Sequence, residues 1–105
     1  MPDASAARRA PDGLPPRIQH YIDGAFVDSV DGDTFGVLDP VTNEVYVHAA
    51  AGKRADIDLA VAAATRAFTD GPWPRMLPRE RSRVLHRIAD IVESRDARLA
   101  ELESF

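Results

Sequence analysis

The feature that most constrains this chain is a change of hydrophobic period near residue 55. Before it, apolar and polar residues alternate in short runs that turn residues separate, which is typical of β-strands. After it, apolar residues recur every three to four positions, which is typical of amphipathic helices. The sequence therefore predicts an α+β architecture in which strands come first and helices follow.

The strand half predicts two β-hairpins. Residues 20–27 flank Asp23-Gly24, a dipeptide that favours the type I′ turn because both of its residues tolerate positive φ angles. Residues 34–48 form the second pair of runs, and Asn43 in the turn between them tolerates the left-handed conformation.

The second half predicts two to three helices. The first begins near Ala55, and one of its faces carries Ile57, Val61, Ala64 and Phe68. After a break at residues 71–74, Pro78 suits the first turn of a second helix, whose apolar stripe comprises Val84, Leu85, Ile88, Ile91 and Val92. A last helical stretch runs to Phe105 without a Gly, Asn or Pro stop signal, from which we expect a piece of a longer chain.

Residues 1–17 differ in composition from the rest. They hold four prolines and very little large apolar surface, so they cannot offset the entropy of ordering. We expect a disordered tail over residues 1–17 and one ordered unit over residues 18–105.

Composition excludes several classes of protein. The 105 residues include 13 basic and 17 acidic ones, for a net charge of −4, and no cysteine. A disulfide framework, a thiolate metal site and a cysteine nucleophile are therefore excluded for this chain. No apolar stretch approaches the ~20 residues that cross a bilayer, so we expect a cytoplasmic chain without membrane contact.

One helical pattern imitates a hydrolase triad. Ser82, His86 and Asp90 follow one another at four-residue spacing, which aligns a hydroxyl, an imidazole and a carboxylate along one face. That face points away from the apolar stripe of the same helix. We interpret it as an ordinary solvated surface and assign no catalytic residue.

Metal, nucleic-acid and nucleotide sites are also weakly indicated. His20, His48 and His86 are too far apart in sequence to form a recognisable ligand motif. Five arginines crowd residues 75–87, but the acidic chain lacks interleaved aromatics, and we expect these arginines to solvate a helix and to pair with acids. Glycine-rich phosphate loops are absent, so no cofactor-binding residue is assigned.

Eight segments in register resemble the N-terminal region of the aldehyde dehydrogenase superfamily. They are residues 21–27, 39–45, 55–64, 67–68, 71–73, 79–81 with 84–85, 88–91 and 99–103. The resemblance covers residues 18–105 and implies the N-terminal part of the aldehyde dehydrogenase α/β fold. Within the superfamily, residues 43–46, 71–76 and 102–105 are most similar to 5-carboxymethyl-2-hydroxymuconate semialdehyde dehydrogenases of aromatic-compound breakdown.

The resemblance implies NAD(P)-dependent oxidation of an aldehyde to a carboxylate, in an intact protein that also supplies a Cys nucleophile, a Glu base and nucleotide-binding loops. It places all of these after Phe105, so we expect the chain to be inactive and to bind no cofactor alone. It also implies a monovalent cation held by the backbone carbonyls of Val37 and Leu38, although Asp39 and Asn43 stand where the family usually has Asn and Gly.

Two partner classes follow from these observations. The first is the remainder of an aldehyde dehydrogenase chain, or a second copy of this one, and neither nucleic acid nor membrane. The alternative is a free-standing α+β adaptor that binds a partner chain through its unpaired strands and apolar helix faces.

Overall fold

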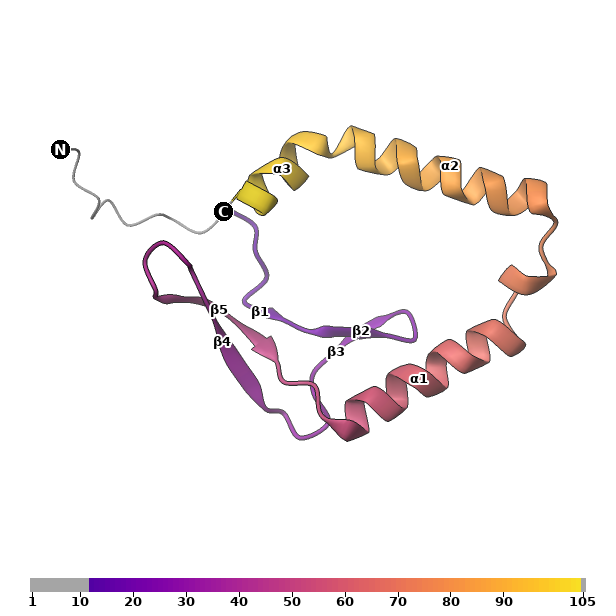
Figure 1. Cartoon of the computed structure of the whole chain (residues 1–105). Helices are drawn as coiled ribbons and strands as arrows, with labels where there is room; N and C mark the ends of the chain where they lie inside the picture. Colours follow the sequence, from indigo (N-terminus) through magenta and orange to yellow (C-terminus); the bar gives the residue numbers. More distant parts are fainter. Residues whose placement is uncertain (1–11, 105) are drawn as a thin grey trace.

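The computed structural model describes residues 12–104 and arranges them as an open frame of strands followed by helices (Figure 1). The strands are β1 (Arg17–Ile18), β2 (His20–Ile22), β3 (Ala25–Val27), β4 (Thr34–Leu38) and β5 (Val45–Ala50). The helices are α1 (Arg54–Thr69), α2 (Pro78–Ser94) and α3 (Asp96–Ser104), with a 3₁₀ turn, η1 (Trp73–Arg75), between α1 and α2. The α+β architecture expected from the change of period is confirmed.

Both expected hairpins are present. Strands β2 and β3 pair antiparallel, and Asp23 and Gly24 between them have φ angles of 55° and 78°, as a type I′ turn requires. Strands β4 and β5 also pair antiparallel, around a turn in which Asn43 has φ of 59°. The turn residues read from the sequence therefore set both connections.

Strand β1 was not predicted. It pairs parallel with β5, so that Arg17 lies opposite His48 and the sheet order is β1-β5-β4. Its Arg17 guanidinium also lies 2.8 Å from the Asp28 carboxylate. Two residues are too few for a periodic pattern, and the partner strand lies far along the chain, so nothing local indicates this pairing.

The predicted disordered tail over residues 1–17 is corrected at its end. Arg17 belongs to β1, so regular structure begins one residue before the expected start at Ile18. Residues 12–16 are described as a turn and irregular chain, while the prediction for residues 1–11 lies outside the described part.

The helices begin with carboxylate caps rather than hydroxyl caps. The Lys53 backbone N–H donates to Asp56 Oδ2 at 2.9 Å, three residues into α1. The Leu77 N–H likewise donates to Glu80 Oε2 at 2.8 Å at the start of α2. Each carboxylate satisfies a backbone donor that the helix itself leaves free, and each also lies near the positive end of the helix dipole.

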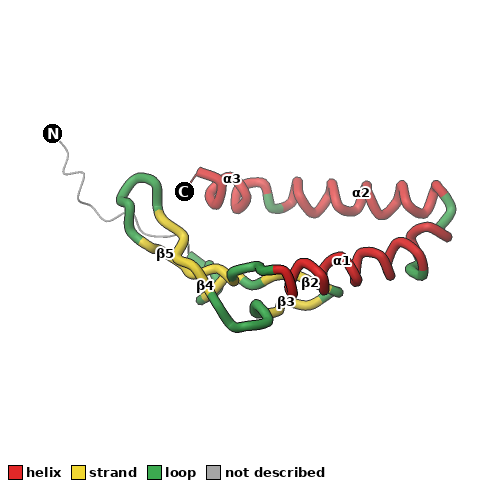
Figure 2. The backbone as a smooth tube through the Cα atoms, turned by 60° about the horizontal axis from the view of Figure 1, so that its bottom comes forward, coloured by secondary structure: helices red, strands yellow, loops and turns green. Residues whose placement is uncertain are grey.

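The described chain encloses almost no hydrophobic core. Its radius of gyration is 18.5 Å, whereas a compact domain of this length has about 13 Å. Among the described residues, Val47 and Ala49 on β5 are the buried apolar ones. Helices α2 and α3 return above α1 towards β1, where Arg98 donates to the Asp12 carbonyl (Figure 2). The fold therefore presents hydrophobic faces instead of closing over them.

Gly71 makes the tight exit from α1 possible. A Cβ added there would lie 2.3 Å from the Ala67 carbonyl oxygen, which is rigid helix backbone. We expect Gly71→Ala to open the last turn of α1 at a cost of about 1 to 3 kcal/mol, because overpacking forces the backbone to move. Hydrogen exchange of the Asp70 and Gly71 amides measures this opening of the last turn. Gly52→Ala is the control, since its Cβ would only approach the His20 ring at 3.3 Å, and an equal effect there would contradict this explanation.

Candidate functional site

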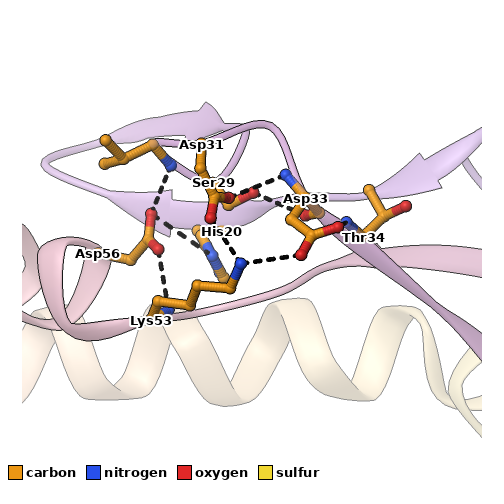
Figure 3. A network of polar contacts seen from close by, with 8 residues as sticks. His20, Ser29, Asp31, Asp33, Thr34, Lys53 and Asp56 are labelled. Carbon is orange, nitrogen blue, oxygen red and sulfur yellow. Dashed lines mark hydrogen bonds and ion pairs between the residues drawn. The ribbon is translucent and has the colours of Figure 1, made fainter.

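A network of polar side chains fastens the start of α1 to the strands (Figure 3). At its centre Asp56, only 4% exposed, accepts the Val30 N–H at 2.8 Å and the Lys53 N–H at 2.9 Å. His20 Nε2 lies 4.0 Å from Asp56 Oδ1, too far for a hydrogen bond. One carboxylate thus joins β2, the loop after β3 and the first turn of α1. We call Asp56 and the residues around it, His20, Val30 and Lys53, the polar junction.

Lys53 extends the polar junction towards the start of β4. Its Nζ lies 2.6 Å from Asp31 and 2.8 Å from Asp33, and Ser29 Oγ donates to the Asp33 carbonyl at 2.7 Å. The ammonium lowers the pKa of both carboxyls, and they in turn raise the pKa of Lys53. These groups are about half exposed, so the ion pairs fix the geometry of the loop more than they stabilise it.

The polar junction predicts a specific acid sensitivity. The Lys53 and Val30 backbone N–H groups, and next the charge of His20, hold the pKa of Asp56 below its usual value. A lowered folded-state pKa stabilises the structure above the unfolded pKa, and this contribution disappears as the pH falls below about 4. We expect Asp56→Asn to remove this pH dependence and to lower the exchange protection of the Val30 and Lys53 amides at neutral pH. Asp58→Asn, at an exposed carboxylate on the same helix, should change neither measurement.

Helix α1 turns its small side chains towards the β2–β3 hairpin. A stripe at helical spacing runs from Asp56 through Ala60, Ala63 and Ala67, and its alanines line a shallow groove with residues 21–24. The absence of large side chains lets the hairpin approach the helix closely. The predicted stripe begins one residue later and is divided. Ala64 lines the same groove and Ile57 borders a second hollow with residues 20–22, whereas Val61 and Phe68 are 58% and 78% exposed.

Helix α2 exposes its predicted apolar stripe as well. Ile88, at its middle, is 52% exposed. Both helices expose large apolar residues, and we call the following set the open helical face: Ile57, Val61, Phe68, Val84, Leu85, Ile88, Ile91 and Val92. Monomeric proteins rarely expose so much apolar surface, so the open helical face is the candidate functional site.

The candidate chemical groups are not assembled into a reactive centre. Ser82, His86 and Asp90 all lie exposed on α2, and no hydrogen bond joins them within residues 12–104. Ser82 and His86 border a shallow hollow with Leu85 and Ala89. The interpretation of this pattern as a solvated helix surface agrees with the structure.

The predicted ion pairs of the arginine-rich segment are not formed. Arg79, Arg81, Arg83 and Arg87 have no ion pair in the part of the chain that the structure describes. Glu80, an expected partner, instead accepts the Leu77 N–H. Arg75 turns back to α1, where its Nη1 donates to the Asp70 and Gly71 carbonyls at 2.6 and 3.1 Å. The sequence could not distinguish pairing with acids from capping of carbonyls.

The described residues contain no cluster of metal-ligating side chains. In residues 12–104 no group of three or more His, Cys, Asp or Glu side chains is placed to hold a metal ion. Val37 and Leu38, the residues expected to offer carbonyls to a monovalent cation, flank a β-bulge in β4. A bulge disrupts the ladder locally, which suits a carbonyl that turns outward, but two oxygens do not make a coordination shell.

The described helices include none that is long and apolar enough to span a membrane.

The polar junction is what sequence reasoning missed. Its one local signal was the acidic residue three positions after Lys53, which is a capping pattern. The contacts with Val30 and His20 depend on the tertiary fold.

Together, the fold and the open helical face define an α+β segment whose large apolar side chains are mostly exposed. The aldehyde dehydrogenase family profile matches residues 26–105, and the chain belongs to this family. Its five strands and three helices match the N-terminal part of the aldehyde dehydrogenase fold.

Individual relatives agree with this assignment. The chain is 54% identical to aldehyde dehydrogenase family 2 member B4 of Arabidopsis thaliana, over 83% of its own length and 16% of the relative. It is 44% identical to the benzaldehyde dehydrogenase of Antirrhinum majus, over 97% of its length and 20% of the relative. An NAD⁺ complex of the Bacillus cereus aldehyde dehydrogenase superposes with a TM-score of 0.78 at 38% identity, over 83% of this chain and 18% of that one. The chain thus spans about a fifth of these proteins.

Proposed function

We propose that this chain forms the N-terminal part of an NAD(P)-dependent aldehyde dehydrogenase, which oxidises an aldehyde to a carboxylate, and that it contributes structure rather than catalytic groups. The observation that carries the proposal is the open helical face, in a chain that aligns with only about a fifth of the length of its relatives. Apolar surface of this extent needs a cover, and the rest of an aldehyde dehydrogenase is the cover that the similarity indicates.

The residues present do not fit a nicotinamide cofactor or the family's thiol chemistry. The chain has no cysteine to attack an aldehyde and no glycine-rich loop to hold a pyrophosphate. The remaining polypeptide would supply these groups. The role of this chain is to hold its strands and α1 in a fixed relation through the polar junction, on which the covering polypeptide then packs.

The test is a hybrid enzyme, in which all 105 residues replace the matching segment of a solved relative such as the Bacillus cereus enzyme. We expect the hybrid to reduce NAD⁺ in the presence of an aldehyde, while the separate 105-residue chain shows no turnover. The same host without its matching segment is the control. A host that works equally well without the segment, or turnover by the chain itself, would contradict the proposal.

The finer expectations also enter as proposals. A muconate semialdehyde of aromatic breakdown is the proposed substrate, supported by the similarity of residues 43–46, 71–76 and 102–105 described above. A monovalent cation at the Val37 and Leu38 carbonyls and a cytoplasmic location are proposed with it. The substrate is tested by comparing kcat/KM for a muconate semialdehyde and acetaldehyde in an active assembly that contains this chain with its natural complement. Preference for acetaldehyde would refute it.

A further inference from the structure

The apolar stripe of α2 contains one charged residue. Leu77, Val84, Ile88 and Ile91 are seven, four and three residues apart. Arg81 lies four residues after Leu77 and three before Val84, so with Arg81 the spacings alternate between four and three. Such a series lines one side of a helix. Arg81 therefore lies within the surface that a covering polypeptide would meet, whereas Arg79 and Arg83 lie on the opposite side.

Arg81 is already half-buried, and it has no partner on its own helix. Its side chain makes no hydrogen bond or ion pair with the described residues, and the nearby Glu80 carboxylate is engaged by the Leu77 N–H. Asp90 comes nine residues later, about 13 Å along the axis and on the opposite side of α2. The position of Arg81 near the start of α2 does not explain its charge either, because a cation near a helix N-terminus is unfavourable to the helix dipole.

Covering the stripe would remove the Arg81 guanidinium from water. A buried charge is strongly unfavourable unless an opposite charge and hydrogen bonds compensate it, and a carboxylate matches the two-pronged geometry of arginine. We propose that the polypeptide covering α2 places an Asp or Glu carboxylate against Arg81, and that this pair fixes the register of α2 in an otherwise apolar interface.

The proposed occupant is the remaining part of an aldehyde dehydrogenase chain, so the inference rests on the proposed function. The Bacillus cereus enzyme supports this choice, because its superposition on this open arrangement uses only 18% of its chain. The other four-fifths are available to cover the helices. A second copy of the present chain is the competing occupant, and the experiment separates the two.

Contact with a carboxylate is tested by cross-linking in the hybrid enzyme, built on a relative that has arginine at the position aligned with Arg81. In the Arg81→Lys variant a carbodiimide should join the new amine to one Asp or Glu of the host portion, which mass spectrometry of the peptides identifies. Arg83→Lys is the matched control and should give no such link. A link only to acids within residues 1–105, or equal linking from both positions, would overturn the proposal.

Neutralisation supplies the second measurement. Arg81→Met keeps an unbranched apolar stem but removes the guanidinium, which leaves the partner carboxylate buried and unpaired. We expect the half-life of activity at a fixed elevated temperature to fall about tenfold or more, while Arg83→Met changes it less than about twofold. Equal half-lives for the two variants in an active hybrid would refute the role of Arg81 alone. An inactive hybrid with Arg81 unchanged would instead refute the proposed function.

Discussion

The separate 105-residue chain is expected to bind the dye ANS strongly and to associate with itself as its concentration rises. The described residues bury only Val47 and Ala49 among apolar side chains, while Phe68 and Ile88 are mostly exposed. A large side chain contributes roughly 1.5 to 3 kcal/mol when fully buried, so a chain with so little burial cannot offset its conformational entropy by a wide margin. Marginal stability and exposed apolar surface together favour association.

Dye fluorescence and sedimentation over a concentration series measure this behaviour. The hybrid enzyme is the control: the proposed covering of the open helical face predicts that it binds little dye. A dye-silent monomer with one sharp thermal transition would show that the face closes within the chain. That result would favour the free-standing adaptor over a part of an aldehyde dehydrogenase.

A single carboxylate introduced on the open helical face is expected to remove nearly all activity of the hybrid enzyme. Ile88→Asp would place an unpaired charge in the interface that covers α2, and an unpaired buried charge costs several kcal/mol. We expect soluble activity to fall by about a hundredfold or more. The measurement is activity per unit of soluble hybrid, with circular dichroism to follow the helix content.

His86→Asp is the matched control for this experiment. It introduces the same side chain two positions earlier, about 160° round α2 from Ile88, and should change activity less than about twofold. If both variants retained activity, the Ile88 side of α2 would lie in solvent in the assembled protein. If both lost it, the helix would be covered on all sides, and the distinction between the two faces would be wrong.

The correspondence between sequence and structure follows the range of the interactions. Asp23, Gly24 and Asn43 adopt positive φ angles because their local steric requirements are the same in any fold. The three helices likewise follow from residue spacing and from the prolines that begin or interrupt them. The absence of cysteine can also be read from the sequence, because composition does not depend on the fold.

The orientation of α1 shows where periodicity fails. The predicted apolar stripe is only partly covered: Val61 and Phe68 are exposed, whereas the alanines beside that stripe line the groove with the β2–β3 hairpin. Two adjacent stripes have the same period, so the sequence cannot choose between them. The choice depends on how closely the β2–β3 hairpin approaches, and only small side chains permit that approach.

The sequence by itself determined the order of strands and helices, both hairpin turns and the absence of cysteine. The tertiary structure alone decided the pairing of β1 with β5 and the burial of Asp56. It also decided which stripe of each helix is left exposed. The physical reason is that turns and helices depend on bonds between residues close in sequence, whereas strand pairing and burial depend on partners that lie far along the chain.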